Sequence, residues 1–176
     1  MKEGYTLRSL NFDDAGEVMT VGSFGMLTIL ETLPESRQDP DLLPNFSARA
    51  MAEMYGEGRE NPKHRYWVVT ELSGMVVGHA IALLRVDDAG ELFGYSYSRY
   101  VLPAHRRAGI GRALLREAIA WWREQGAAYV MAHTHPTNAA LLGLFKGAGF
   151  VEHERTNKRW PSVALRLELT SRREDL

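Results

Sequence analysis

The chain has 176 residues, of which 45% are hydrophobic and 24% charged, a balance that is typical of folded globular proteins and excludes a disordered chain. Its formal net charge is −1, so no global field attracts the protein to nucleic acid or to an acidic membrane surface, and any basic site must be local. Because it contains no cysteine, disulfides, thiolate metal ligands and a cysteine nucleophile are excluded.

The N-terminal residues lack the apolar run of a signal peptide, and no stretch approaches the ~20 apolar residues of a membrane span. We therefore expect a cytoplasmic protein that makes no use of a membrane. The length fits one domain over residues 1–176, with its core at 5–169 and a charged, frayed tail at 171–176.

Hydrophobic spacing and turn residues predict the elements in chain order. They are a strand at Tyr5–Leu10, helices at Phe12–Thr28 and about Asn45–Tyr55, strands at Arg65–Leu72, Met75–Val86 and Glu91–Leu102, a helix at Gly109–Gln125, a strand at Ala128–Ala132, a helix at Asn138–Ala148, a strand after Gly149-Phe150 and a strand at Ser162–Leu169. This order predicts an α/β fold of α+β layout, in which a mixed central sheet is flanked by helices. The irregular, proline-punctuated stretch 31–61 is a long insertion of the kind that often serves as a binding lid.

One loop between a predicted strand and a predicted helix is rich in glycine and arginine: Arg106-Arg107-Ala108-Gly109-Ile110-Gly111. A helix N-terminus leaves its first amides unpaired and carries a partial positive charge, and glycine lets an anion approach the backbone closely. With Arg112 nearby, the loop suits a pyrophosphate. A plain tight turn with solvated arginines would explain the hexapeptide alone, and neither the P-loop pattern nor the dinucleotide fingerprint is present.

The residues around this loop decide between these interpretations. Arg106-x-x-Gly109-x-Gly111, preceded by Val101-Leu102-Pro103, closely resembles the acetyl-CoA signature of the GNAT N-acetyltransferase superfamily. The segment from Asn138 to Gly149-Phe150 resembles the second conserved segment of that family, and the order of elements matches its layout over nearly the whole chain.

The resemblance implies a GNAT-like fold that binds acetyl-CoA as cosubstrate. The central strands, here Tyr95–Leu102 and Ala128–His133, would splay apart and hold pantetheine between them. Backbone groups of Val101, and of Tyr100 or Leu102 beside it, would pair with the pantetheine amides. The Val101 N–H is the candidate donor to the tetrahedral oxyanion.

The same resemblance assigns the rest of the cofactor site. The amides of the loop would hold the pyrophosphate, with help from Arg112: Arg106, Arg107, Ala108, Gly109, Ile110 and Gly111. Asn138 matches an asparagine that contacts the cofactor arm, although an N-cap for the next helix would also explain it. Phe145 stands where many relatives have a tyrosine acid, so it can pack against the cofactor but has no proton to give.

The catalytic and acceptor residues are less determined. Tyr97 and Glu91 are candidates for catalysis, although packing in the sheet and an exposed turn would also explain them. Tyr95, His133 and Trp160 are candidates for the acceptor site, together with the 31–61 insertion, whose acidic residues would attract a cationic amine. His133 and His135 form a His-x-His pair, but no third ligand has sensible spacing, so we predict no metal.

The leading hypothesis is therefore an acetyl-CoA-dependent N-acetyltransferase acting on a primary amine of a small molecule or peptide by direct attack. Its rival is a non-catalytic acyl-CoA-binding module, motivated by Phe145. Nucleic-acid binding through the basic loop is disfavoured because the chain has no wider basic stripe. The sequence leaves open the acceptor and whether the protein is a homodimer.

Overall fold

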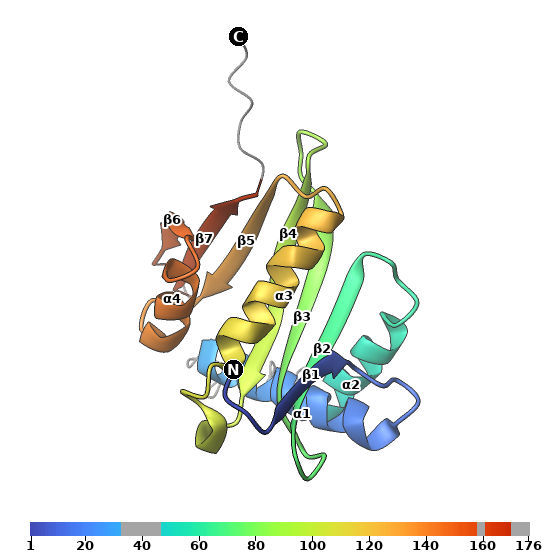
Figure 1. The fold of residues 1–176 in the computed structure, drawn as a ribbon. Helices are drawn as coiled ribbons and strands as arrows, with labels where there is room; N and C mark the ends of the chain where they lie inside the picture. Colours follow the sequence, from blue (N-terminus) through green and yellow to red (C-terminus); the bar gives the residue numbers. More distant parts are fainter. Residues whose placement is uncertain (33–46, 158–160, 170–176) are drawn as a thin grey trace.

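The computed structural model describes residues 1–32, 47–157 and 161–169, and its strands form one seven-stranded sheet of order β1-β2-β3-β4-β5-β7-β6 (Figure 1). The elements are β1 (Tyr5–Ser9), α1 (Ala15–Thr32), α2 (Ala48–Glu57), β2 (His64–Glu71), β3 (Val76–Val86), β4 (Leu92–Val101), a short 3-10 helix (Pro103–His105), α3 (Ile110–Glu124), β5 (Tyr129–Thr134), α4 (Ala139–Lys146), β6 (Val151–Thr156) and β7 (Ser162–Glu168). Strands β4 and β5 run parallel, whereas the other pairs of neighbours are antiparallel. The predicted mixed sheet flanked by helices is confirmed.

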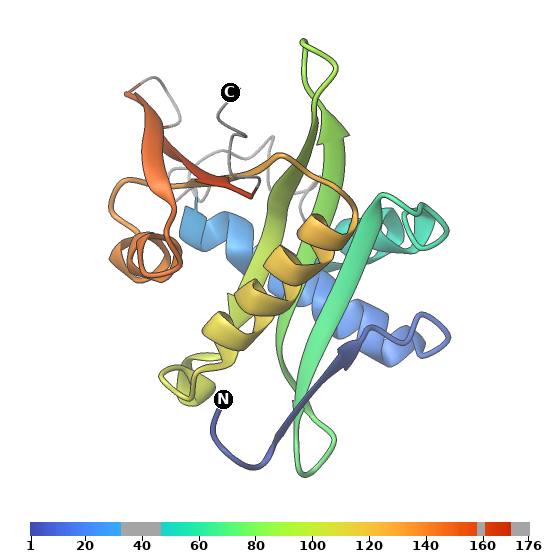
Figure 2. The same ribbon diagram turned by 45° about the horizontal axis from the view of Figure 1, so that its top comes forward.

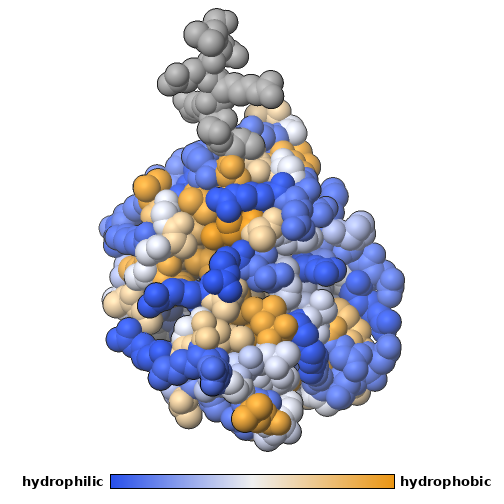
Figure 3. All heavy atoms as spheres, viewed as in Figure 1, coloured by the Kyte–Doolittle hydropathy of each residue, from blue (hydrophilic) through white to orange (hydrophobic). Residues whose placement is uncertain are grey.

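Two helices cover each face of the sheet (Figures 1 and 2). Helices α1 and α2 pack over one face with Val21, Phe24 and Tyr55 in the core, and α3 and α4 belong to the apolar cluster on the other face. The outer side of α3 carries charged residues, as expected for an amphipathic helix, whereas Lys146 is the only charged residue of α4, and this face of the molecule shows apolar patches among hydrophilic surface (Figure 3). None of the helices in the described ranges is long and apolar enough to cross a membrane.

Helix α1 runs unbroken through glycines whose spacing makes its apolar pattern irregular. A Cβ at Gly22 would collide with the Ala48 carbonyl, and one at Gly25 would collide with the Tyr55 hydroxyl, both on α2. These glycines therefore let α1 and α2 approach closely. The helix begins at Ala15 rather than at the predicted Phe12, because the residues before it form a turn whose Asp14 carboxylate accepts from the Glu17 N–H at 3.1 Å.

The central strands separate halfway along their length. The register of β3 against β4 shifts between Ile81 and Ala82, which leaves Tyr97 as an extra residue in β4. Pairing between β4 and β5 extends only from Phe93 to Ser96 on the β4 side, while β5 continues to pair with β7 as far as Thr134. Beyond the bulge, the facing edges of β4 and β5 are therefore open to each other.

Candidate cofactor and acceptor site

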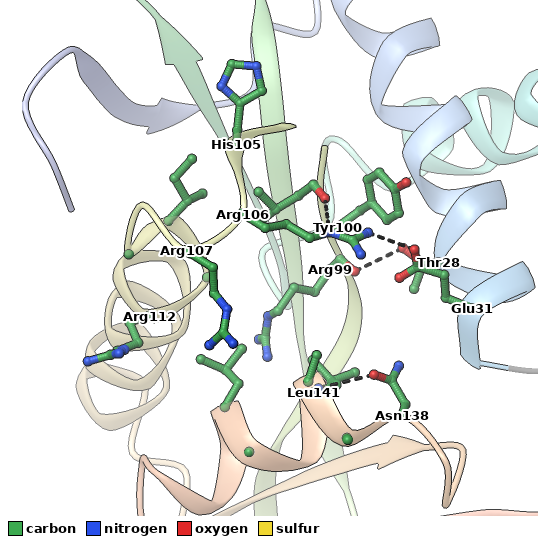
Figure 4. A pocket seen from close by; sticks show the side chains of 18 of the residues that line it. Thr28, Glu31, Arg99, Tyr100, His105, Arg106, Arg107, Arg112, Asn138 and Leu141 are labelled. Carbon is green, nitrogen blue, oxygen red and sulfur yellow. Dashed lines mark hydrogen bonds and ion pairs between the residues drawn. The ribbon is translucent and has the colours of Figure 1, made fainter. Parts of the chain in front are cut away.

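The larger cavity, of about 970 Å³, lies at the open end of the central strands (Figure 4). Its walls are the end of α1, the last residues of β4, the glycine-rich loop with the start of α3, and the start of α4. Four segments that are distant in sequence thus meet around one space at the point where β4 and β5 diverge.

The loop presents a helix N-terminus to this cavity. Gly109 is the N-cap of α3 in the left-handed region, with φ 82° and no side-chain cap, so the amides of the first turn keep no partner from a capping side chain. Gly111 has space for a Cβ, whose nearest contact would be Leu144 at 3.5 Å. Arg107 is a non-glycine residue with positive φ, 65°, and Figure 4 shows its side chain directed into the cavity.

The sequence did not predict the short 3-10 helix that precedes this loop, nor the contacts of Arg106 within the cavity. The Arg106 Nε donates to the Val101 carbonyl at 2.9 Å, and its Nη2 donates to the Glu31 carboxylate at 2.7 Å. Arg106 therefore bridges β4 and the end of α1, as the dashed lines in Figure 4 show. Glu31, expected to attract a cationic acceptor, is instead paired with an arginine.

Strand alternation determines which backbone groups of β4 face the opening. The Leu102 N–H donates to the Val77 carbonyl on β3 at 2.9 Å, so its amide is engaged and the suggestion that Leu102 pairs with the cofactor is wrong. Successive backbone groups of a strand point in opposite directions, so those of Val101 and Arg99 point away from β3 and into the opening. The bond from Arg106 to the Val101 carbonyl fits this direction.

Several of the predicted cofactor residues have another contact in the structure. The Asn138 side chain accepts from the Leu141 N–H at 3.2 Å, so it caps α4, and it also lines the large cavity. Ala108 is buried and its carbonyl accepts from the Lys2 N–H. The Tyr100 side chain points to the α1 face, where its ring lies 5.3 Å from that of Phe24.

A smaller cavity, of about 240 Å³, continues from the large one around the bulge. It is lined by Gly25, Thr28, Ile29, Thr32, Met51, Tyr95, Ser96, Tyr97, Ser98, Arg99, His133, Thr134, Leu141, Phe145, Pro161 and Ser162. Thr28, Arg99 and Leu141 line both cavities. Tyr95, Tyr97 and His133, three residues predicted from the sequence, therefore lie together at the end of this space.

Two histidines near the small cavity have lowered pKa values. Partial desolvation lowers the pKa of His133, which is still exposed at the surface and whose ring lies 5.7 Å from that of Tyr95. Burial, with a smaller contribution from Arg99, lowers the pKa of His79 to about 3, and its Nε2 lies 2.7 Å from the Ser98 hydroxyl oxygen. A neutral imidazole can accept a proton, and of the two only His133 lines a cavity.

Glu91 lies outside this group. Glu91 is exposed in the turn before β4, where its N–H donates to the Asp87 carboxylate at 2.8 Å. Ten residues of extended strand separate it from Val101, roughly 30 Å, so the suggestion that Glu91 serves as a catalytic base is wrong. Trp160 lies outside the described residues, as do residues 33–46 of the irregular 31–61 segment. Across the residues that are described, no group of three or more potential ligands could hold a metal ion.

Arg99 is the site residue that sequence reasoning missed. Its side chain is 8% exposed, lies 4.9 Å from the centre of the Phe145 ring and donates through Nη2 to the Ser96 hydroxyl at 2.9 Å. The one signal in the sequence was an arginine within the strand Tyr95–Leu102, but nothing local indicated that α4 would cover it.

Comparisons with known proteins agree with this architecture. The model of the acetyltransferase (GNAT) family matches residues 29–150. The aminoglycoside N(6')-acetyltransferase type 1 of Klebsiella aerogenes is 31% identical over 109 residues, which are 51% of this chain and 72% of that protein.

Two solved structures are similar over nearly their full lengths. The yncA protein of Salmonella typhimurium, solved with its cofactor acetyl-CoA, has a TM-score of 0.66 at 22% identity, covering 96% of this chain and 95% of that one. The spermidine N-acetyltransferase of Vibrio cholerae, in complex with CoA and spermine, has a TM-score of 0.69 at 15% identity, covering 96% and 97%. The family match, the mixed sheet and the open central strands together place this chain in the GNAT family of acetyltransferases.

Proposed function

We propose that this acyltransferase moves the acetyl group of acetyl-CoA to a primary amine of a small molecule or peptide. The observation that carries the proposal is the divergence of β4 and β5 at Tyr97, which turns the backbone of Val101 toward a cavity that begins at the α3 N-terminus. A cosubstrate with an anionic end and a hydrogen-bonding arm fits such a cavity along its length.

The anionic end of acetyl-CoA fits the loop at the start of α3. The unpaired amides after Gly109 and the partial positive charge of the helix N-terminus favour a pyrophosphate, and Arg107 points into the same space. The Arg106 side chain donates a hydrogen bond to the Val101 carbonyl. It must leave that carbonyl when the pantetheine arm pairs with β4, and the pyrophosphate is the nearest anion that would receive it.

The reaction forms a carbon–nitrogen bond and breaks the carbon–sulfur bond of the thioester. The acceptor must first lose a proton, because an alkylammonium titrates near ~10.4. We assign this proton to the His133 imidazole, directly or through water, because it lines the small cavity and its lowered pKa favours the neutral form. The Val101 N–H, which faces the opening, would donate to the oxyanion of the tetrahedral intermediate.

The CoA thiolate then leaves and takes up a proton from solvent. Phe145 is fully buried against Phe150 and has no proton to supply. A thiol with a pKa of roughly 8.5 leaves without an acid, so the missing tyrosine hydroxyl does not prevent transfer. We also propose that residues 5–169 act as one catalytic domain.

The experiment is release of free CoA thiol from acetyl-CoA by the purified chain across a panel of amines, with product mass confirmed. The proposal expects saturable CoA binding and, with at least one amine, one N-acetyl product for each thiol released. Saturable binding of acetyl-CoA without thiol release for any small amine or peptide would refute transfer and leave the acyl-CoA-binding module as the function.

A further inference from the structure

Arg99 is a buried cation without a protein anion. Its Nη2 has the Ser96 hydroxyl as acceptor, but its Nε and Nη1 have no hydrogen-bond partner among the residues that the structure describes. The Phe145 ring covers the guanidinium at 4.9 Å, and such a contact offsets only part of the lost hydration. Burial lowers the pKa of Arg99 to about 10, so the group remains charged at neutral pH.

A charge in this position is costly unless something compensates for it. Removing a guanidinium from water without an ion-pair partner costs several kcal/mol in general, and proteins retain such groups mainly where a ligand completes them. Stabilising the fold does not explain Arg99, because apolar residues of similar volume pack as well or better. The position of Arg99 suggests a role in binding instead, because Arg99 lines both the large and the small cavity.

Acidic side chains are scarce around Arg99 among the residues that the structure describes. None of the residues described as lining the small cavity is Asp or Glu, and the one acidic residue described on the large cavity, Glu31, is already paired with Arg106. Arg85, whose guanidinium lies 4.1 Å from the centre of the Tyr95 ring, adds a further positive charge near the small cavity. The described charges nearest the junction are therefore those of arginines, apart from the paired Glu31.

We infer that Arg99 binds a carboxylate of the substrate at the junction of the two cavities and selects substrates that carry one. This inference rests on the proposed function and narrows its substrate class. The planar guanidinium matches a carboxylate through two parallel hydrogen bonds, which the free Nε and an Nη group supply. A polyamine would bring a positive charge beside Arg99 with no acid to offset it, so acceptors of that class are disfavoured.

Two parts of the reacting pair could carry the carboxylate. One is the acceptor, which would then be an amino acid or a similar molecule holding an amine and a carboxylate together. The other is the acyl group, which would then be a dicarboxylic acyl thioester of CoA. The chemistry at Arg99 is the same for both, so the experiment must vary each partner separately.

The acceptor arm compares matched pairs that differ by one carboxylate: L-phenylalanine with phenethylamine and L-leucine with isopentylamine, each with acetyl-CoA. The acyl arm compares succinyl-CoA with butyryl-CoA, using one amine that the panel has identified. We expect the wild-type chain to favour the carboxylate member of one arm by about 30-fold or more in kcat/KM, which corresponds to the lower range for a buried charged hydrogen-bonded pair.

Variants then assign that preference to Arg99. Arg99→Gln should lose the preference, because its kcat/KM should fall much further for the carboxylate member than for the uncharged member, and Arg99→Lys should keep part of the preference because the charge remains. The matched control is Arg123→Gln, which removes one arginine from the exposed far end of α3 and should leave the ratio unchanged. Arg99→Gln should melt at or above the wild-type temperature, since no protein anion loses its partner. If Arg99→Gln fails to fold, Arg99→Lys is used in its place, and its ratio of kcat/KM between the carboxylate and uncharged members is compared with that of the wild type.

A binding measurement separates this inference from the proposed function. N-acetyl-L-leucine should raise the melting temperature of the wild-type chain more than N-acetyl-isopentylamine does, and Arg99→Gln should remove the difference. This result without any thiol release would support the carboxylate site while refuting transfer. Transfer with equal kcat/KM within every pair, or an equal loss for both members in Arg99→Gln, would overturn the inference and leave the proposed function intact.

Discussion

The two ends of the large cavity handle positive charge in opposite ways. At the loop, Arg107 and Arg112 are exposed, so water screens them and a phosphate can reach them without displacing a protein anion. At the opening between β4 and β5, Arg99 is buried and most of its donors have no protein acceptor. The loop is thus suited to affinity for an anion, whereas the opening is suited to discrimination, because a wrong substrate leaves a buried charge unpaired.

This contrast also separates what each end contributes to the reaction. Backbone amides at the α3 N-terminus bind any suitable phosphate and say little about the acceptor. The opening holds the groups that we propose act on the substrate: the Val101 N–H and the His133 ring at the reacting atoms, and Arg99 at a carboxylate. Changes at the loop should therefore appear in CoA binding, and changes at the opening should appear in turnover and substrate choice.

The largest effect should follow Gly111→Glu at the loop. A carboxylate about 4 Å from a phosphate charge costs roughly 4 kcal/mol at an effective dielectric constant of 20, which is about a 1,000-fold loss in affinity. Titration calorimetry with CoA should detect it as loss of measurable binding.

The matched control for that change is Gly111→Ala. The added Cβ would meet only Leu144, at the ordinary distance of 3.5 Å, so the variant should fold and keep most of its CoA affinity. Unaltered CoA binding by Gly111→Glu would remove the loop from the cofactor site.

At the opening, His133→Gln should reduce kcat by about 100-fold, the usual range for removing a general base, while CoA affinity stays within a few-fold. In the wild type, kcat/KM should rise with pH through a midpoint below the usual histidine pKa, because burial lowers the pKa of His133. The variant should lose that acidic limb. A pH–rate profile identical to the wild type would show that another group takes the proton.

The buried polar groups behind the opening predict a dependence of stability on pH. Folded His79 stays neutral down to about pH 3, whereas the unfolded chain binds a proton below about 6.5. Stability should therefore fall as pH decreases through this window, by about 1.4 kcal/mol per unit from this residue. Urea unfolding at several pH values should show a shallower slope for His79→Gln, which keeps a polar partner for Ser98. Parallel slopes would contradict a neutral buried His79.

The smallest effect should come from Glu31→Gln. Glu31 pairs with Arg106, which also bonds to the Val101 carbonyl at the opening. The Arg106–Glu31 pair is half exposed, and such pairs contribute about 0–1 kcal/mol, so releasing Arg106 should improve CoA affinity by roughly threefold. Glu53→Gln is the control, because it breaks another exposed pair, with Arg49, far from the loop. Weaker CoA binding by Glu31→Gln would mean that Glu31 supports the bound state.

The loop could be predicted from sequence because its function depends on neighbours in the chain. Glycine spacing and an amphipathic pattern predicted a helix at Gly109–Gln125, and α3 spans Ile110–Glu124 with Gly109 in the left-handed region. The pattern also identified which side of the helix is buried, with Leu114 and Trp122 in the core. Each of these inferences depends only on residues that are close together in the sequence, within a few turns of one helix.

The opening could be predicted only by resemblance, because its parts depend on distant contacts. The bulge at Tyr97 is defined by register against β3, and the burial of Arg99 depends on Phe145, which is 46 positions further along the chain. Glu91 was predicted to be the first residue of the strand, whereas β4 begins one residue later, and the length of that strand puts Glu91 at the opposite end from the opening. The alternation of backbone direction along β4 is likewise set by its pairing with β3. It turns the backbone N–H and carbonyl of Val101, and not those of Leu102, toward the cofactor cavity.

The most direct test of the central claim is amide hydrogen exchange, resolved by residue, with and without acetyl-CoA. If the thioester arm lies between β4 and β5, the amides of Arg99 and Val101 should exchange more slowly on binding, together with those of Ile110 and Gly111 at the loop. The Leu102 amide, already bonded to β3, should change little. Protection confined to the loop, with Arg99 and Val101 unchanged, would contradict the account.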